Sequence, residues 1–527
     1  MPVNVIWAPD NKMPKAVSDL GFFSLMVALI FILVFTYVSR ERYFYFWDNL
    51  YYQNSAFHLA DTFRTSLPSV IPLVSRTLSY EYNNIFALPL IPLILVFGGS
   101  RLGYITSLAL VYQLAYAIAL GYLASRIFKT TPRPAFWITA FMVIFTPFSW
   151  VTTLRGTPDI GGALLLVLAL SIYIPDPLLK SYRRIIILGI LLGVMVLFRR
   201  HFAYPALAFF ISLVLYSPKN IYRAGLTAGV SLCFLLVFGR PFLIRALTTN
   251  YLVLYSSYMV SPWSVFIYFL TFFGLIVWTL SILGMKYLPR QVNLLALISL
   301  FIWIFIVRQP GSQYALHFNF LIILGLVSHL LHHRLRFAGI FMVLFLCVNF
   351  FWGLFGYRIG NNILLSAPTP PLVRTDYDQI VQLVAYLRTI TTASDPIYVV
   401  DSSLIMNDDL LFEADKILNT DGPKLHILIS PQVDSRDWLP LQDLLQAEYV
   451  VLSQPFQHHL PESKQKVVSV VYTAFMDNWD IAKDFLPLPR TFDLAGGVRL
   501  RIYHRIRPTS PEIAEKTAIQ ISSYVYQ

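Results

Sequence analysis

The carboxylate of Asp48 lies about ten residues beyond the first long apolar run of the sequence. A fixed carboxylate at the edge of a membrane could act as a general base, because it can accept the proton of an acceptor hydroxyl. Asp61, Glu81 and Asp159 are secondary candidates for this role. A solvated acid above an interfacial aromatic belt is the alternative interpretation of Asp48. That belt would comprise Tyr43, Phe44, Tyr45, Phe46, Trp47, Tyr51 and Tyr52.

Arginines in the loops of one predicted side of the membrane are candidate ligands for a phosphate group. The planar fork of arginine binds phosphate through two hydrogen bonds and stays charged in a half-buried site. Between the first and last apolar spans every lysine falls in loops of the other side, whereas the cations on this side are all arginine. Pairing with lipid headgroups, or an accident of composition, is the alternative. The candidate phosphate ligands are Arg155, Arg199, Arg200 and Arg308.

Other polar residues in the same turns are candidates for further substrate contacts. Gln313 and His317 are four residues apart and would share one face of a helix. A hydrogen bond between helices explains His317 almost as well as contact with a ligand. The residues considered for these contacts are His201, Gln313, Tyr314 and His317.

Three local patterns also have purely structural interpretations. Arg155 and Asp159 share one turn, where a local ion pair would stabilise the backbone. Two pairs near the C-terminus are typical of a solvated surface, and we assign them no role. These pairs are Asp408-Asp409 and His458-His459.

The composition indicates a membrane protein. The chain has 527 residues, of which 57% are hydrophobic and only 13% are charged, whereas a soluble protein carries about 25% charged residues. The net charge of +12 comes from short loops between apolar runs, so we do not interpret it as nucleic-acid binding. Both cysteines, Cys233 and Cys347, fall inside apolar runs, and no Cys/His cluster suggests a metal site.

The apolar runs predict a polytopic α-helical membrane protein with about eleven transmembrane helices. The first outer loop, residues 39–101, contains a short run with two prolines at Ile85–Phe97, which suits a helix at the interface. The predicted spans are Leu20–Val38, Leu102–Ala124, Ala135–Phe145, Ile160–Ile174, Ile185–Phe198, Phe202–Tyr216, Ala224–Arg240, Trp263–Gly284, Val292–Val307, Ala315–Leu331 and Phe337–Phe355.

Charge and composition then predict the orientation and a second domain. Lysine and arginine clusters follow the positive-inside pattern when the N-terminus is cytoplasmic. Residues 1–355 would form the membrane domain. Residues 356–527 would form an extracytoplasmic α/β domain, because short β-branched runs alternate there with amphipathic helices. The pieces are Asp376–Ile390, Ile397–Val400, Asp408–Leu418, His426–Ile429, Leu441–Ala447, Tyr449–Leu452, Val467–Thr473 and Val498–His504.

This organisation resembles the GT-C membrane glycosyltransferases, in the branch of protein O-mannosyltransferases and the aminoarabinose transferase of lipid A. Asp48 matches the position of the first-loop acid of that family. The run Asn83–Phe97 with its exit Gly98–Leu102 is similar to the second juxtamembrane helix of the family. Two outer-turn patterns look like those of bacterial members, namely Arg155–Asp159 and Arg199–His201. The tandem Asp-Glu often seen in this family is Asp48-Asn49 here, which removes an obvious pair of metal ligands.

The resemblance implies a sugar donor linked to polyprenyl phosphate and an inverting transfer, with Asp48 as base and arginines holding the lipid phosphate. We therefore expect that the reaction needs no cofactor or metal, and a requirement for a divalent cation is the alternative. The acceptor could be a glycan, a lipid or a protein. The expected location is the inner membrane of a bacterium, which the absence of Asn-x-Ser/Thr sites fits. A polysaccharide polymerase or ligase and a secondary transporter are the alternatives.

Overall fold

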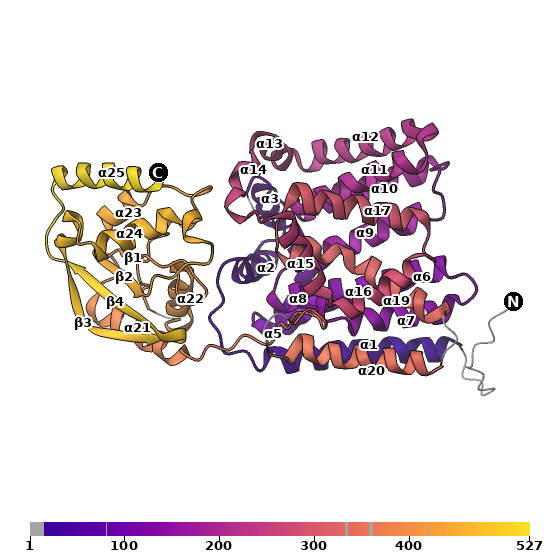
Figure 1. The fold of residues 1–527 in the computed structure, drawn as a ribbon, viewed down its shortest axis with the longest axis horizontal. Coiled ribbons are helices and arrows are strands. Elements are labelled where there is room, and N and C mark those ends of the chain that lie inside the picture. Colours follow the sequence, from indigo (N-terminus) through magenta and orange to yellow (C-terminus); the bar gives the residue numbers. More distant parts are fainter. Residues whose placement is uncertain (1–14, 81, 333–335, 358–361, 421, 527) are drawn as a thin grey trace. The chain divides into compact units, whose positions relative to one another are not determined.

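The computed structural model describes residues 15–80, 82–332, 336–357, 362–420 and 422–526, which divide into two units (Figure 1). The membrane unit comprises Met1–Ser39, Tyr52–Arg245 and Ser261–Pro371. The C-terminal unit comprises Arg40–Tyr51, Ala246–Val260 and Leu372–Gln527. Two short stretches of the first and later loops thus belong with the C-terminal residues, a grouping that the boundary predicted at residue 355 does not include.

The chain before Pro371 is almost entirely helical, because backbone groups in an apolar setting must pair within their own segment. Its longer helices are α1 (Lys15–Val38), α2 (Asp48–Thr65), α3 (Leu67–Thr77), α4 (Ile91–Phe97), α5 (Arg101–Leu108), α6 (Leu114–Ile127), α7 (Pro132–Ile144), α8 (Val151–Arg155), α9 (Asp159–Tyr173), α10 (Tyr182–Phe198), α11 (Ala203–Tyr216), α12 (Ile221–Phe238), α13 (Arg240–Thr248), α14 (Tyr251–Leu254), α15 (Pro262–Phe273), α16 (Leu275–Met285), α17 (Arg290–Ile302), α18 (Ser312–Ala315), α19 (Asn319–His332) and α20 (Arg336–Phe355). Short 3-10 or π turns lie between them at Ile85–Leu90, Ala109–Gln113, Pro147–Ser149, Arg200–Phe202, Pro218–Asn220, Ser256–Tyr258, Trp303–Val307 and Leu316–Phe318.

Among the described residues, 5 helices are long and apolar enough to cross a membrane, or up to 6 if one bent pair counts as a single span. Several other predicted spans correspond to shorter apolar helices, such as Asp159–Tyr173 and Arg200–Tyr216. The protein is therefore a multi-pass membrane protein with a largely helical fold, and the count of about eleven spans stays a prediction.

The single helix predicted over Trp263–Gly284 is wrong, because the chain bends by 92° between α15 and α16. The break falls at Gly274, whose φ of +82° lies in the region that favours glycine. A Cβ there would lie 2.6 Å from the backbone carbon of Leu365. The N–H of Leu275, freed by the break, donates to the carbonyl of Ile363 at 2.7 Å. The bend thus depends on a distant segment, which a local pattern does not reveal.

Small residues let the membrane helices pack closely, as is common where lipid offers no hydrophobic driving force. A Cβ on Gly284 of α16 would lie 1.9 Å from the carbonyl oxygen of Gly325 in α19. Along another edge of this unit α1 and α20 run side by side (Figure 1), and the rings of Tyr37 and Phe355 are 6.1 Å apart.

The C-terminal unit is built on one mixed sheet with the strand order β1-β2-β4-β3. β1 (Ile397–Val399) pairs parallel with β2 (Tyr449–Gln454), and β4 (Val498–Arg505) pairs antiparallel with both β2 and β3 (Phe485–Leu494). The predicted piece His426–Ile429 joins the sheet edge through a bridge between Ile397 and Ile427. The helices of this unit are α21 (Tyr377–Ile390), α22 (Asp408–Leu418), α23 (Leu441–Gln446), α24 (Lys466–Met476) and α25 (Pro511–Tyr526).

Helices cover both faces of this sheet, and alternate strand residues face the two layers. Val451 packs in a core with residues of α21 and α22, whereas Val450 and Leu452 pack with residues of α23, α24 and α25. The β-branched run Val467–Thr473 lies in a helix, α24, because one side of that helix fills the second core. The α/β class predicted for this part of the chain agrees with this arrangement.

Aromatic residues of the first loop lie in the core of the C-terminal unit, so their interpretation as an interfacial belt is wrong for Phe44 and Phe46. These side chains are 0% and 2% exposed and pack with residues of α21, α22, β2 and β4. Arg42 reinforces the attachment, since it bonds to Asp378 at 2.6 Å and pairs with Val373 through the backbone. The stretch before Asp48 is therefore held by the C-terminal unit.

The surface interpretation of Asp408-Asp409 and His458-His459 is also wrong in part. Asp408 is 5% exposed and accepts a hydrogen bond from the backbone N–H of Ser430 at 2.7 Å. His459 is half-buried, with its ring 4.8 Å from that of Trp47. His458 is exposed as predicted. The difference arises because His459 and Asp409 both contact Trp47, in the loop that precedes α2.

Candidate active site

A buried ion cluster connects α9 with the turn that follows α10. Asp159, the first residue of α9, is fully buried and accepts a 2.7 Å hydrogen bond from Nε of Arg199. Nε2 of His201 lies 3.5 Å from the same carboxylate oxygen. The guanidinium of Arg199 also stacks over the ring of Tyr52, 4.6 Å from its centroid. We refer to Asp159, Arg199 and His201 as the Asp159 cluster.

The Asp159 cluster extends into the segment after Arg308. His201 forms a hydrogen bond with the backbone of Gln313, and its ring lies 5.1 Å from that of Tyr314. The sequence had proposed these residues separately as substrate contacts, and the structure brings them together. The segment 308–317 is therefore held by a hydrogen bond to His201, which itself lies beside Asp159.

His317 lies deeper and has its hydrogen bonds satisfied within the protein. The hydroxyl of Tyr204 lies 3.2 Å from Nδ1 of His317 and also donates to the carbonyl of Tyr314. Nε2 of His317 lies 2.8 Å from the hydroxyl of Ser299. Since His317 is only 2% exposed, this geometry fits the interhelical hydrogen bond that we considered as its alternative role.

Arg155 is hydrogen-bonded to the backbone, whereas Asp159 pairs with Arg199. The turn can therefore be explained without a local ion pair between Arg155 and Asp159. One terminal nitrogen of Arg155 donates to the carbonyl of Pro370 at 3.1 Å. Its other terminal nitrogen is buried and has no hydrogen-bond partner within the described part of the chain. A buried donor without a partner calls for an explanation, and a bound anion would supply one.

Gly156 makes room for a further arginine beside this turn. Its φ is +88°, and a Cβ there would lie 2.5 Å from a terminal nitrogen of Arg101. Arg101 donates to the side chain of Gln53 at 3.1 Å and to the carbonyl of Leu154 at 3.2 Å. The Arg-Gly-Thr-Pro-Asp pattern therefore has a structural reason at its glycine, and Arg101 joins the arginines of this region.

The remaining arginine candidates lie in neighbouring turns and are half-buried. Arg200 begins the short 3-10 turn Arg200–Phe202, and Arg308 follows the π turn Trp303–Val307. Arg308 has a φ of +55°, an uncommon conformation that turns the backbone at this point. Residues with such backbone strain are enriched at functional sites.

Asp48 begins α2, where the positive end of the helix dipole favours a carboxylate. The residue before it, Trp47, has a φ of +51°, which is unusual for a bulky side chain. The carboxylate of Asp409 accepts a hydrogen bond from the backbone N–H of Trp47. A residue that we had placed on a solvated surface thus fixes the turn that presents Asp48.

The secondary acids differ in their surroundings. Asp61 is exposed on α2, and its carbonyl accepts a hydrogen bond from the hydroxyl of Thr65. Asp159 is engaged with Arg199, as described above. Glu81 lies outside the described residues. Within the residues that the structure describes, no group of three or more His, Cys, Asp or Glu side chains could hold a metal ion.

Sequence reasoning missed several partners that complete these contacts. Tyr52 lies under Arg199, and Tyr204 and Ser299 satisfy His317. Each resembles an ordinary helix residue in the sequence, so no local signal marks it. Tyr52 was noted only as part of an aromatic belt, yet it is 1% exposed.

Comparison with known proteins relates the fold of this chain to solved structures. No protein-family model matches the sequence, nor does any curated protein sequence. Two solved structures match in fold, ArnT from Cupriavidus metallidurans in the apo state and the same protein bound to undecaprenyl phosphate. In each case the TM-score is 0.51 at 13% identity, over 94% of this chain and 100% of that chain. The chain shares the fold of ArnT.

The fold shared with ArnT agrees with the resemblance found in the sequence and extends over 94% of the chain. At this level of identity the comparison establishes the fold, and the roles of single residues stay predictions.

Proposed function

We propose that this protein transfers a sugar from a polyprenyl-phosphate donor to an acceptor hydroxyl. The observation that supports this most directly is the GT-C fold shared with ArnT, of which one solved structure holds undecaprenyl phosphate. The arginines gathered around the start of α9 are the proposed partners for the phosphate in the membrane unit. The acceptor, whether a glycan, a lipid or a protein, is not specified by these features.

In this proposal the phosphate is held by arginine guanidinium groups. Arg155 supports this role because it offers a buried N–H without a protein partner. Arg199 is oriented by Asp159, whose carboxylate accepts a hydrogen bond from its Nε at 2.7 Å. Arg200 and Arg308 are the further proposed ligands. Donors fixed in place before the reaction stabilise a developing charge without reorganisation, typically by about 3–4 kcal/mol each.

Asp48 is the proposed general base. It would remove the proton of the acceptor hydroxyl as the oxygen attacks the anomeric carbon. The bond from that carbon to the phosphate oxygen breaks on the opposite face, so the configuration inverts and the lipid phosphate leaves as an anion. A base of this type usually contributes about 10²–10⁴-fold to the rate.

The proposal includes the topology predicted from charge. The N-terminus and the lysine-containing loops would be cytoplasmic, and the C-terminal unit would lie outside the inner membrane of a bacterial cell. The reaction would then take place at the outer leaflet. No metal is required in this scheme, since arginines take the place of a cation at the phosphate.

The test is release of polyprenyl phosphate by the purified protein in proteoliposomes that contain a radiolabelled polyprenyl-phosphate sugar and candidate acceptors. The proposal predicts protein-dependent release with the label transferred to an acceptor. Transport of intact label into the vesicle lumen, without release, would instead support the transporter alternative. Growth of a labelled glycan chain by repeated addition would support the polymerase alternative.

A further inference from the structure

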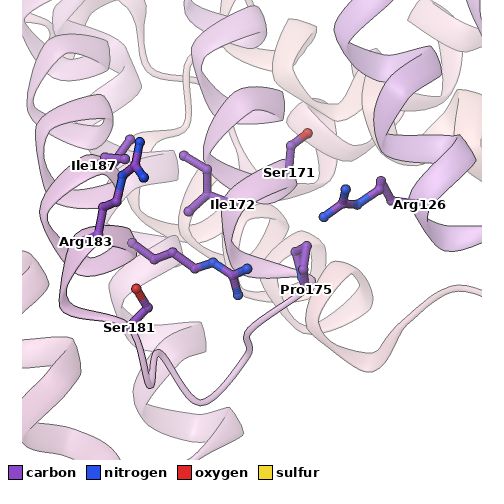
Figure 2. A pocket seen from close by; sticks show the side chains of 8 residues that line it. Arg126, Ser171, Ile172, Pro175, Ser181, Arg183 and Ile187 are labelled. Atoms are coloured by element: carbon purple, nitrogen blue, oxygen red, sulfur yellow. The ribbon is translucent and has the colours of Figure 1, made fainter.

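A second basic site lies at the other end of the helices that carry the Asp159 cluster. A pocket of about 420 Å³ lies between the ends of α6, α9 and α10. Figure 2 shows the side chains that line it. Asp159 begins α9 and Ser171 lies near its end, so the two sites are about 18 Å apart along the helix at 1.5 Å per residue. The pocket is lined by Arg126, Ser171, Ile172, Pro175, Ser181, Arg183, Arg184 and Ile187.

The charge of this pocket is strongly positive. Three of its lining residues are arginines, and none of its lining residues is an acid. In Figure 2 the side chain of Arg126 extends toward Ile172 and Pro175, on the opposite side of the pocket from Arg183. Guanidinium groups that line one pocket raise its positive potential, which favours the binding of an anion there.

Asp176, an acid next to the pocket residue Pro175 in the sequence, does not line the pocket and is hydrogen-bonded within its own loop. Asp176 is 9% exposed and accepts hydrogen bonds from the backbone N–H groups of Lys180 and Ser181 at 3.1 and 3.2 Å. It also lies 3.4 Å from Arg184. Asp176 therefore shapes the loop between α9 and α10 and offsets part of one arginine, while Arg126 and Arg183 keep their charge for a ligand.

The choice of residues points to phosphate rather than to a general basic surface. Lys129 and Lys180 lie close by in the sequence but do not line the pocket, whereas every cation that lines it is arginine. Arginine binds phosphate through a planar pair of N–H groups. The hydroxyls of Ser171 and Ser181 lie in the same wall, and Ile172, Pro175 and Ile187 add an apolar side.

We propose that this pocket binds a phosphate group at the face of the membrane unit remote from the Asp159 cluster. The apolar side favours the headgroup of an anionic phospholipid, since a headgroup carries apolar chain next to its phosphate. Free phosphate is the other source of the same chemistry. Basic pockets between membrane helices are known to hold lipid headgroups of this type. This site is separate from the proposed sugar transfer and does not depend on it.

The experiment uses the full-length protein in a neutral detergent. Binding of phosphatidylglycerol is measured by native mass spectrometry, with phosphatidylcholine as the zwitterionic reference, and inorganic phosphate is titrated by calorimetry. The test variant is Arg126→Gln with Arg183→Gln. The control variant is Lys129→Gln with Lys219→Gln, which removes the same charge from exposed positions that do not line the pocket.

We expect phosphatidylglycerol to bind in preference to phosphatidylcholine, and the arginine variant to weaken this binding roughly tenfold or more. The lysine variant should change it by less than about twofold, because neither lysine lines the pocket. Binding that persists in millimolar inorganic phosphate identifies the lipid headgroup as the source. Saturable binding of inorganic phosphate alone, lost in the arginine variant, identifies free phosphate and equally supports the site.

The proposal is overturned if both variants weaken binding equally, or if neither probe responds to the arginine variant. Thermal unfolding of each variant checks that the fold is kept. If the double arginine variant does not fold, Arg126→Gln alone serves as the test, since Arg126 is exposed and bonds to Tyr122 of its own helix.

Discussion

The ring of Phe44 stacks on the ring of Tyr377, with centroids 4.3 Å apart and planes 9° from parallel. Phe44 comes from the first loop, four residues before Asp48, and Tyr377 begins α21 of the C-terminal unit. The contact makes the C-terminal unit the support of the stretch that presents the proposed base. This gives the C-terminal unit a function that its sequence alone does not suggest.

Replacing Phe44 with alanine should destabilise the C-terminal unit and lower turnover together. Loss of a buried phenylalanine typically costs about 3–5 kcal/mol. Hydrogen exchange of the full-length protein would show faster exchange in Tyr377–Ile390 and in the residues around Asp48. Leu486→Ala, at an exposed position of the same unit, is the control. Equal exchange in the Phe44 variant and the wild type would contradict the role of this contact.

Asp409 should act as a positioning residue, because its carboxylate accepts the backbone N–H of Trp47 next to Asp48. We expect Asp409→Ala to lower kcat by about tenfold with little change in KM, since a base that is poorly placed affects the chemical step. Asp477→Ala, at an exposed acid of the same unit, should leave both constants unchanged. A loss of thermal stability without a change in kcat would assign Asp409 a structural role only.

The pair of Asp159 and Arg199 should be coupled in stability but not in activity. Asp159→Asn should cost about 3–5 kcal/mol, because it leaves a half-buried guanidinium without its carboxylate. Adding Arg199→Gln should restore part of that loss, as a double-mutant cycle of unfolding would measure. Turnover should stay low in the double variant if Arg199 also binds the donor phosphate. Recovery of turnover along with stability would show that Arg199 is structural.

The stability of the C-terminal unit should fall as the pH rises toward 7. Burial raises the pKa of Asp401 to about 7, and burial together with the charge of Asp409 raises the pKa of Asp408 to about 7. Both are protonated more readily in the folded chain than in the unfolded chain, where the pKa is near 3.8. Their stabilising contribution is therefore complete below about pH 4 and is lost as the pH rises through about 7.

Hydrogen exchange of α22 and β1, corrected for the intrinsic pH dependence of exchange, measures this effect. Each acid should contribute a slope of up to about 1.4 kcal/mol per pH unit between these limits. Asp401→Asn and Asp408→Asn should each flatten the dependence. Protection that does not change between pH 5 and pH 8 in the wild type would show that these carboxylates are charged in the folded protein.

The predicted apolar runs correspond to helices in the structure, because backbone groups in an apolar setting must pair within their own segment. The break at Gly274 was missed since it depends on contacts with Ile363–Leu365, far away in the sequence. Aromatic residues suit both a membrane interface and a protein core, so composition alone did not reveal that Phe44 and Phe46 are buried. The contact partners of a side chain are therefore the feature that the sequence predicts least well.

In the candidate site, too, the residue types could be predicted from the sequence but the contact partners could not. Outer-turn arginines and polar residues were predicted from residue type, and the structure gathers Arg199, His201 and Gln313 around Asp159. The sequence suggested a local ion pair of Arg155 with Asp159 as the structural alternative, because the two are close along the chain. Helix packing instead brings Arg199 to that carboxylate, across a separation of forty residues. Ion pairs of this kind follow from the tertiary fold and leave no local pattern.

The most direct test of the central claim compares wild type with Asp48→Asn in the transfer assay with a radiolabelled polyprenyl-phosphate sugar. Both proteins should fold and bind the lipid equally, because asparagine keeps the size of the side chain and also suits a helix start. The account predicts that wild type releases polyprenyl phosphate and that the variant is slower by at least about 100-fold. Equal release by the two proteins would contradict the assignment of Asp48 as the base.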